Sequence, residues 1–202
     1  HTDITTTQGD RAKLEDLVRN DALTGLRSRT FFNMEVERIE QNHIRPVSVI
    51  ACDVNGLKLI NDYLGHATGD TLLADTALLL RRSLRATDCI ARMGGDEFAL
   101  YWGDRPLDFL IRKARLLVKL VREAFRSSEA LRLIAPSIGI VRCDEAGLTL
   151  DELIRRADVA MYTAKRGKLG YCVYEPGLEK RSDEALRSGA PDDEGAHADS
   201  RF

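Results

Sequence analysis

The stretch that decides the fold is RMGGDEF, residues 92–98. Apolar residues 89–91 precede it and residues 98–102 follow it, so two strand-like runs flank the pair Gly94-Gly95. Glycine adopts positive φ without a steric penalty, and a Gly-Gly pair between two such runs therefore predicts a β-hairpin. Asp96 and Glu97 then lie at the tip of a tight turn. Considered alone, this tip is an ordinary solvated acidic turn, and evidence for a function has to come from the rest of the chain.

The composition favours one globular domain with appendages. The chain has 202 residues, of which 44% are hydrophobic and 31% are charged, and a core of this size buries most of its apolar surface. The formal net charge of −2 gives no bulk attraction to nucleic acid or to an anionic membrane. We therefore expect no nucleic-acid partner and no membrane contact from this segment, while a local basic pocket for phosphate groups stays compatible with the charge.

The cysteines and the hydropathy indicate a cytoplasmic location. The four cysteines are scattered, without a C-x-x-C pair or a histidine at ligand spacing, which favours reduced buried thiols over disulfides or zinc. No apolar run approaches the roughly 18 residues that a membrane helix needs, and no signal peptide is visible. The chain begins at His1 without methionine, which indicates a piece of a longer protein, and a membrane anchor outside this segment stays open.

Three segments differ in their pattern. In residues 11–20, Leu14, Leu17 and Val18 form one apolar stripe on a charged helix, suited either to packing on the domain or to a two-chain seam. We assign residues 1–20 to a linker or signalling helix at the end of an upstream sensor, such as a PAS domain. Residues 21–176 form the domain, and residues 177–202, which are polar, are expected to be a disordered tail or a linker.

The pattern of strands and helices predicts an α/β sandwich of the α+β type. Residues 47–53 are almost wholly apolar until Asp53, as expected of a strand buried on both faces. Ser28 is the expected N-cap of the first helix of the domain. Further helices are expected over 56–64, from 69 onward, over 106–125 and over 150–165, and further strands over 131–141 and 171–174. With the hairpin, this order predicts a mixed, mainly antiparallel five-stranded sheet flanked by helices.

Two carboxylates are expected at one rim of that sheet. Asp53 ends the first long strand and Asp96 lies at the hairpin tip, so the two meet if their strands are neighbours. Like charges placed together repel unless a cation joins them, and oxygen ligands of this kind suit Mg²⁺. The alternative is that Asp53 only caps the following helix. The strand pattern by itself leaves both interpretations open.

Residues 94–98 resemble the signature of the GGDEF family of diguanylate cyclases, and four further blocks resemble that family in order and at the usual spacing. These blocks are DALTGL at 21–26, DVNGLKLINDYLGHATGD at 53–70, SIGI at 137–140 and ADVAMYTAK at 157–165. The resemblance covers about residues 21–174. It implies a palm-like nucleotidyl-cyclase fold and the condensation of two GTP molecules into cyclic di-GMP with release of two pyrophosphates. Since each domain holds one GTP, it also implies a homodimer.

The resemblance implies a role for each matching residue. The metal ligands for two Mg²⁺, with Mn²⁺ as a substitute, are Asp53, the backbone carbonyl of Val54, Asp96 and Glu97. The catalytic set is Asp96 as proton acceptor, Glu97 beside it, and Lys58, whose positive charge stabilises the negative charge of the phosphates. The substrate-binding set is Asn61 and Asp70 for guanine, His66 as a further contact, Arg92 and Lys165 for phosphate, and Gly94 and Gly95 for close approach of the backbone. Each of these residues also has an ordinary structural role, such as a helix cap or a solvated lysine.

Two departures from the family pattern and one further motif bear on activity. Asn55 stands where the family usually has a second acid. After Lys165 the segment to Gly170 is one residue shorter than the family pattern and has a lysine in place of the usual arginine. A lysine cannot form the two parallel hydrogen bonds of an arginine, so the contact with the terminal phosphate is expected to differ. Arg85 and Asp88 have the R-x-x-D form and the offset of the family's inhibitory product site, although such a pair alone is often only a surface ion pair.

The sequence therefore gives two functional hypotheses. The first is an active, product-inhibited diguanylate cyclase that works as a dimer. The alternative is a catalytically weak module that binds GTP or cyclic di-GMP and regulates an attached phosphodiesterase or other domain. Intact Asp53, Asp96 and Glu97 favour the enzyme, and the altered segment after Lys165 keeps the alternative open.

Overall fold

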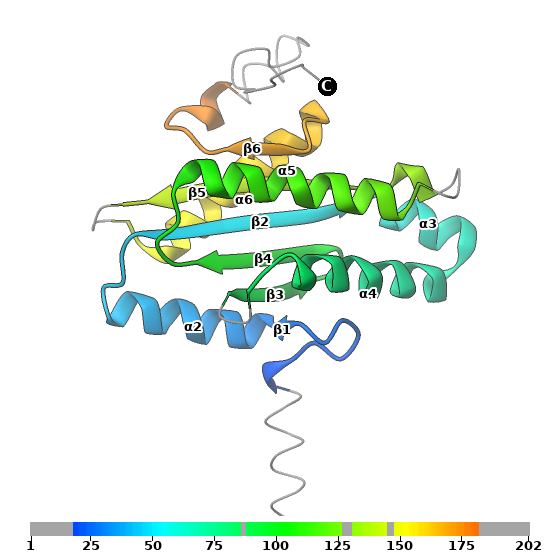
Figure 1. The fold of residues 1–202 in the computed structure, drawn as a ribbon, viewed down its shortest axis with the longest axis horizontal. Helices are drawn as coiled ribbons and strands as arrows, with labels where there is room; N and C mark the ends of the chain where they lie inside the picture. Colours follow the sequence, from blue (N-terminus) through cyan, green and yellow to red (C-terminus); the bar gives the residue numbers. More distant parts are fainter. Residues whose placement is uncertain (1–17, 86–87, 127–130, 145–147, 182–202) are drawn as a thin grey trace, which may run out of the picture.

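The computed structural model describes residues 18–85, 88–126, 131–144 and 148–181. Its centre is a sheet with the strand order β1-β3-β4-β2-β5-β6, covered by helices on both faces (Figure 1). The strands are β1 Arg27–Ser28, β2 Val47–Asn55, β3 Cys89–Gly94, β4 Glu97–Trp102, β5 Ala135–Cys143 and β6 Tyr171–Val173. The helices are α2 Arg29–Gln41, α3 Leu57–Leu64, α4 His66–Arg82, α5 Leu107–Ala124 and α6 Leu150–Gly167, with a 3-10 turn η1 at Leu131–Leu133.

The sheet is mixed and mainly antiparallel, as predicted. The central strand β2 pairs antiparallel with β4 on one side and with β5 on the other, while β1 pairs parallel with β3 and β6 parallel with β5. The expected number of five strands is wrong by one. Strand β1 adds the sixth by pairing Arg27 with Ala91 and Ser28 with Arg92, and two residues are too few to show the alternation by which a strand is recognised.

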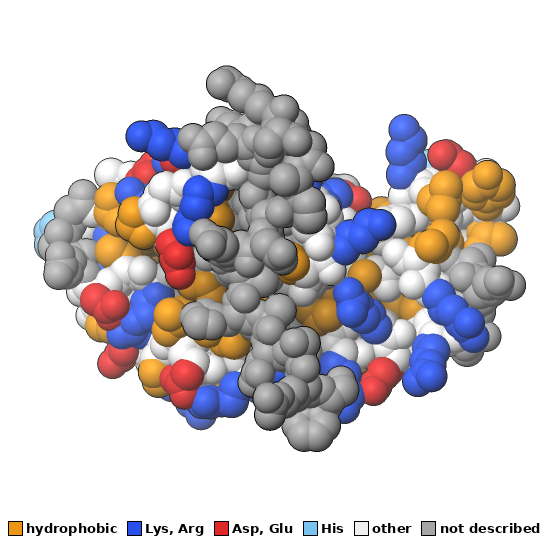
Figure 2. Space-filling model, turned by 90° about the horizontal axis from the view of Figure 1, so that it is seen from above, with side chains coloured by type: hydrophobic (Ala, Val, Ile, Leu, Met, Phe, Trp, Pro, Cys, Tyr) orange, Lys and Arg blue, Asp and Glu red, His pale blue; other side chains and the backbone are white. Residues whose placement is uncertain are grey.

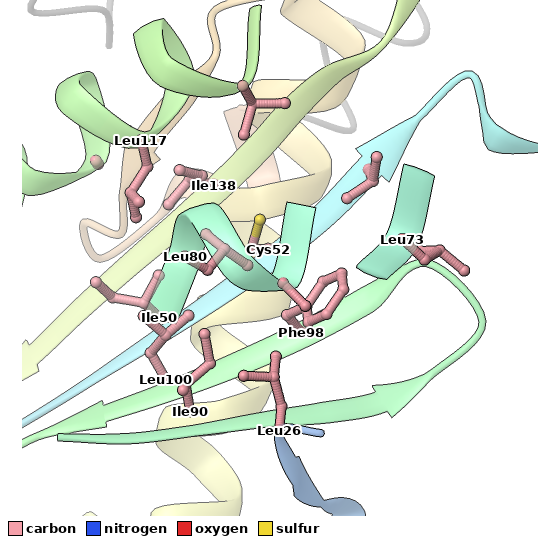
Figure 3. Close-up of a cluster of buried hydrophobic side chains, with 14 of the residues drawn as sticks. Leu26, Ile50, Cys52, Leu73, Leu80, Ile90, Phe98, Leu100, Leu117 and Ile138 are labelled. Carbon is pink, nitrogen blue, oxygen red and sulfur yellow. The ribbon is translucent and has the colours of Figure 1, made fainter. Parts of the chain in front are cut away.

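Strand β2 is buried on both faces and therefore has two core layers against it. Eight of its nine residues are buried. Ile50 and Cys52 point to the layer of α3, α4 and α5, where Figure 3 shows Leu80 and Leu117 over the sheet. Val49 and Ala51 point to the layer of α2 and α6. Because side chains alternate along a strand, Asp53 belongs to the α6 side.

Helix α6 lies unusually close to the sheet at Gly139. A Cβ atom placed on this glycine would lie 2.0 Å from the carbonyl oxygen of Ala157 and 2.3 Å from the amide nitrogen of Met161. The backbone of α6 therefore rests directly on β5, and glycine is the residue that permits this approach. The close contact fixes how far the later turns of α6 stand from the end of β2.

The helix boundaries confirm some expectations and correct others. Ser28 is the N-cap of α2, since its Oγ accepts a hydrogen bond from the Phe31 amide at 3.1 Å. Helix α4, expected from Gly69, begins at His66, because Gly65 with φ 85° turns the chain and lets the helix restart at once. Asp70 is consequently inside α4 and is not its cap. Strand β5 begins at Ala135 and not at Leu131, because η1 precedes it.

The two ends of the chain are described only in part. Residues 18 and 19 are helical, and the rest of the stripe expected over 11–20 lies outside the described residues. After β6, residues 178–181 form a helical turn in which Leu178 is buried against Ala160, Ala164 and Cys172. The disordered tail or linker expected from residue 177 therefore does not include this turn, which is held by buried Leu178 and by an ion pair of Glu179 with Arg155. Residues 182–202 of the expected tail lie outside the described part.

The remaining general expectations concern thiols and charge. All four cysteines are free thiols, as predicted, and burial raises the pKa of Cys52 to about 12. No helix in the described ranges is long and apolar enough to cross a membrane. Lys and Arg side chains are interspersed with Asp and Glu on the face that Figure 2 shows.

Candidate functional site

The acids of the hairpin and of β2 meet at one rim of the sheet. The register of β2 and β4 places Asp53 opposite Glu97, and the Val54 amide donates a hydrogen bond to the Asp96 carbonyl at 3.0 Å. Asp53 is buried, with 5% of its surface exposed, whereas Asp96 is half-buried and Glu97 is exposed. The strands that carry Asp53 and the hairpin are neighbours, so the condition under which the sequence analysis expected these acids to meet is fulfilled.

Lys165 of α6 forms an ion pair with the buried acid of this rim. Its Nζ donates to both carboxylate oxygens of Asp53, at 2.9 and 3.0 Å. Burial raises the pKa of Asp53, and the negative charge of Asp96 raises it further, while the hydrogen bond and charge of Lys165 act in the opposite direction. The pKa of Asp53 is raised overall, so Lys165 offsets only part of the effect of burial on this carboxylate.

Asn55 uses its side chain to tie β2 to β5. Its Nδ2 donates to the Ala135 carbonyl and to Ser137 Oγ, both at 2.7 Å. A carboxylate has no hydrogen to donate, so the asparagine at this position makes a link that an aspartate could not make. Its Oδ1 is buried without a hydrogen-bond partner among the described residues. Asp53 is therefore the single charged side chain at the end of β2.

The two glycines of the hairpin are required by backbone conformation. Gly94 has φ 144° and Gly95 has φ 52°, both unfavourable for other residues. A Cβ atom added at either position would meet nothing within 4 Å, so the turn is open on its outer side. The predicted hairpin is confirmed, and its tip leaves room for a ligand to approach the backbone.

Arg92 connects this hairpin to the loop at residues 21–26. Its Nε and Nη2 donate to the Gly95 carbonyl at 3.0 and 2.8 Å, and its Nη1 donates to Asp21 at 3.2 Å. Burial tends to raise the pKa of Asp21, but hydrogen bonds from Thr24 and the adjacent Arg92 lower it overall. The guanidinium is engaged within the chain in this structure, and the phosphate contact expected for Arg92 stays a prediction.

A second group of predicted residues lies on the helical hairpin of α3 and α4. Asn61 sits directly over Gly69, because a Cβ atom on that glycine would be 1.9 Å from Asn61 Oδ1. This oxygen is buried without a hydrogen-bond partner within the described part of the chain. Asp70, the next residue after Gly69, is exposed, as are His66 on the first turn of α4 and Lys58 on the first turn of α3. The exposed Asp70 carboxylate can accept hydrogen bonds from a ligand, whereas Asn61 Oδ1 is enclosed against Gly69.

One acid at this site had no role in our sequence analysis. Asp158 lies on α6, open to solvent on one side, yet the protein atoms around its carboxyl and the negative charge of Glu97 raise its pKa. It precedes Lys165 by seven residues, which is two helical turns, so both side chains project from the same face of α6. That spacing is the signal by which it could have been found.

Arg85 and Asp88 lie elsewhere, beside the end of β3 that is opposite to the hairpin. They line a pocket of about 460 Å³, and the Arg85 amide donates to the Asp88 carboxylate at 2.9 Å. The other lining residues are Asn20, Gly25, Leu26, Arg27, Arg81, Leu84 and Ile90. With three arginines and one carboxylate, the pocket suits a ligand that carries both phosphates and hydrogen-bond donors.

Comparison with known proteins places this arrangement in a family. The model of the family described as diguanylate cyclase, GGDEF domain, matches residues 18–170, which include the rim, the helical hairpin of α3 and α4, and the second pocket. The chain belongs to the GGDEF family. The expected resemblance is thereby confirmed, as is the fold class, since solved GGDEF domains share the helix-flanked mixed sheet.

Two relatives of this GGDEF chain have names that refer to cyclic di-GMP. MucR of Pseudomonas aeruginosa, a bifunctional diguanylate cyclase/cyclic di-GMP phosphodiesterase, is 37% identical over 179 residues, which cover 87% of this chain and 26% of MucR. PdeR of Escherichia coli, a cyclic di-GMP phosphodiesterase, is 33% identical over 187 residues, covering 92% of this chain and 28% of PdeR. The chain therefore spans about a quarter of the length of these relatives.

A solved structure agrees with the sequence comparison. The GGDEF domain of DgcB from Caulobacter crescentus, crystallised in complex with c-di-GMP, superposes with a TM-score of 0.69 at 26% identity. The match covers 77% of this chain and 94% of the DgcB chain.

The donors at the rim fit the Mg²⁺ ions on which GGDEF diguanylate cyclases generally depend. The described residues contain no cluster of three or more His, Cys, Asp or Glu side chains able to hold a metal by themselves. Mg²⁺ does not need such a cage, because it typically takes one or two carboxylates and completes its shell with water and substrate phosphates. The Asp53 and Asp96 carboxylates and the Val54 carbonyl are oxygen donors of that kind.

Proposed function

We propose that this GGDEF domain is an active diguanylate cyclase that condenses two GTP molecules into cyclic di-GMP and two pyrophosphates. The observation that carries the proposal is the rim, where buried Asp53 meets Asp96 and Glu97 beside an open Gly94-Gly95 turn. Asp53, the Val54 carbonyl, Asp96 and Glu97 would hold two Mg²⁺, or Mn²⁺ in their place. Bound there, the metal would neutralise phosphate charge and make the attacking hydroxyl more acidic.

Guanine would be selected by Asn61 and Asp70. Asp70 presents an exposed carboxylate, and Asn61 Oδ1, buried without a hydrogen-bond partner among the described residues, would become the second acceptor when its side chain turns toward the base. Guanine offers an N1–H and an exocyclic amine as a pair of donors, whereas adenine offers no such pair. Acceptors that the wrong base leaves unpaired in the bound complex disfavour ATP, and sites of this type discriminate by roughly 10⁴. His66, on the first turn of α4, is the further contact.

The remaining residues position phosphates and accept a proton. Phosphoryl transfer asks little covalent work of the protein, so charge and orientation supply most of the catalysis. Lys58 and Lys165 bring positive charge from α3 and α6, and the turn at Gly94 and Gly95 lets the backbone approach the nucleotide. Asp96, with Glu97 beside it, takes the proton of the 3′-hydroxyl, for which a carboxylate of ordinary basicity is sufficient.

The reaction requires a second copy of the chain. One domain has one rim and one base site and therefore holds one GTP, so the 3′-hydroxyl must come from a GTP on a facing partner. We propose a homodimer for this reason. The two domains approach through the rims, where the hairpin tip is open.

Product inhibition would act through the second pocket. Arg85 and Asp88, with the neighbouring Arg27 and Arg81, provide guanidinium groups for phosphates and a carboxylate for a guanine edge. The DgcB domain that resembles this chain was crystallised with c-di-GMP. The pocket lies at the far end of β3 from the hairpin, so product bound there leaves the rim intact and acts by holding two domains apart. Arg85→Ala should relieve inhibition, while Arg82→Ala, which removes the same charge outside the pocket, should not.

The decisive test is turnover by the purified chain. The chain, fused behind a leucine zipper that enforces a dimer, is incubated with GTP and Mg²⁺, and cyclic di-GMP is measured by chromatography. We expect product from the wild type and none from Asp96→Asn. If the forced dimer makes no product at high protein concentration, the cyclase proposal is refuted.

One observation supports a second candidate, a non-catalytic regulatory module. A cyclic di-GMP phosphodiesterase, PdeR, contains a matching segment, and in this chain the altered segment after Lys165 continues α6 to Gly167 and ends it at Lys168, which has φ 53°. Binding of GTP or cyclic di-GMP without turnover in the same assay would favour that role. The location in the cytoplasm and the absence of a nucleic-acid partner remain predictions.

A further inference from the structure

The ion pair between Lys165 and Asp53 occupies the position at which the proposed metal would bind. The ammonium lies 2.9 and 3.0 Å from the two carboxylate oxygens, so both oxygens of Asp53 are engaged by one cation. Among the described residues, Lys165 is the one cation at ion-pair distance from Asp53. The carboxylate cannot bind a metal in full until this lysine has moved away.

The two partners differ in their freedom to move. The Asp53 side chain is 7% exposed, on a strand hydrogen-bonded on both sides, whereas the Lys165 side chain is 42% exposed on the last turns of α6. A lysine has four rotatable bonds and a compact charged end. Lys165 can therefore swing toward solvent, or toward a phosphate, while Asp53 stays in place.

The residues around Asp53 explain why one lysine is enough to balance its charge. Asn55, where the family usually has a second acid, is neutral and is bonded to β5. Asp53 is thus the single buried charge at the end of β2, and one ammonium balances it. A buried carboxylate without a partner would be strongly unfavourable, so the pair has a purpose in the protein before any ligand binds.

We propose that Lys165 is an internal counter-ion that holds the metal position at Asp53 and transfers to the nucleotide phosphates when the metal arrives. This inference rests on the proposed function of the rim. Its consequence is an order of binding. A metal ion alone must displace the ammonium and leave it unpaired, whereas a metal ion that arrives with a nucleotide brings a new anion for the same lysine. Metal and nucleotide therefore bind with positive coupling, and Lys165 is the residue that couples them.

The test measures metal binding without turnover. Mn²⁺ binding to the chain is followed by electron paramagnetic resonance, first alone and then with 3′-deoxy-GTP, which lacks the attacking hydroxyl. We expect wild type to bind Mn²⁺ weakly alone and much more tightly with the nucleotide. Lys165→Met should bind Mn²⁺ alone at least about tenfold more tightly than wild type, and its coupling to the nucleotide should fall by a similar factor.

Three controls make the result specific. Lys119→Met removes the same charge from α5, on the other face of the sheet, and should behave as wild type. Lys165→Arg keeps a cation at Asp53 and should keep Mn²⁺ binding alone weak. If Lys165→Met does not fold, as judged by circular dichroism, Lys165→Gln, which keeps a hydrogen-bond donor, takes its place.

The outcomes separate this inference from the proposed function. Equal Mn²⁺ affinities for Lys165→Met, Lys119→Met and wild type in the absence of nucleotide would overturn the counter-ion role, even if the enzyme is active. If wild type binds no Mn²⁺ even with 3′-deoxy-GTP, and Asp53→Asn is no different, the metal site itself fails and the proposed function fails with it.

Discussion

Gly139 is the position where one added methyl group should separate α6 from the sheet. In Gly139→Ala the new Cβ would lie 2.0 Å from the Ala157 carbonyl oxygen, and real contacts of this kind stay at 3.0 Å or more. Helix α6 must therefore move by the difference, about 1 Å. The atoms in the way belong to the backbone of α6 and cannot rotate aside, so we expect the upper end of the usual overpacking penalty, about 3 kcal/mol.

The same shift should reach the candidate site at the rim of the sheet. Lys165 and Asp158 both project from α6, and a displacement of about 1 Å at a positioning group can lower a rate by roughly 10²-fold. Cyclic di-GMP synthesis should therefore fall even at temperatures where the variant is fully folded. Activity is measured well below the unfolding midpoint to keep the two effects apart.

Urea unfolding provides the assay and Gly103→Ala the matched control. A Cβ atom on Gly103 would meet nothing within 4 Å, so the same chemical change at that position should be nearly neutral. With a urea m-value of about 1–3 kcal/mol/M, a loss of about 3 kcal/mol lowers the midpoint by about 1 M or more. If the two variants unfold within about 0.5 kcal/mol of each other, α6 does not rest on β5 as described.

Three further predictions concern single residues of the site. Asp53→Asn should abolish cyclase activity, because it removes a proposed metal ligand. Because burial raises the pKa of Asp53, the charged carboxylate is disfavoured in the folded state, and the same variant should raise the urea midpoint at pH 7. This gain should vanish as the pH falls below the ordinary aspartate pKa of about 4. A pH-independent gain would contradict the role of burial. Asp70→Ala should reduce the preference for GTP over ATP by at least about 10²-fold in competition assays, and an unchanged preference would remove Asp70 from the base site. Arg92→Ala should lower the free energy of unfolding by about 1.5–3 kcal/mol, since it removes charge-assisted hydrogen bonds. It should also raise the pKa of Asp21, measured by NMR, and a constant Asp21 pKa would mean that Arg92 does not act on it.

Much of the fold follows from periodicity, and the exceptions have local causes. Strand β2 and helix α6 are long enough for their apolar patterns to be unmistakable. The start of α4 was misplaced because Gly65 allows two helices to follow each other with almost no loop. Strand β1 was missed because two residues carry no pattern, and its pairing depends on β3, which is far away in sequence.

The sequence predicted which residues lie at the candidate site better than it predicted which atoms they contact. The sequence predicted that Asp53 and Asp96 meet if their strands are neighbours, and the pairing of β2 with β4, which sets Asp53 opposite Glu97, meets that condition. Sequence spacing does not give the direction of a long side chain, which explains why Lys165 was expected at a phosphate and lies on Asp53 in this structure. Asp158 was overlooked because its significance depends on Glu97, from a different part of the chain.

The link from Asp21 through Arg92 to Gly95 has a mechanical consequence. A single side chain spans from the loop where the described chain enters the domain to the carbonyl of the residue next to Asp96. A twist or pull on the chain near residue 18 would therefore reach the Gly94-Gly95 turn as a small change in its angle, without repacking the hydrophobic core. A signal from outside the domain would then act through one side chain, while the sheet and the helices packed on its two faces keep their positions.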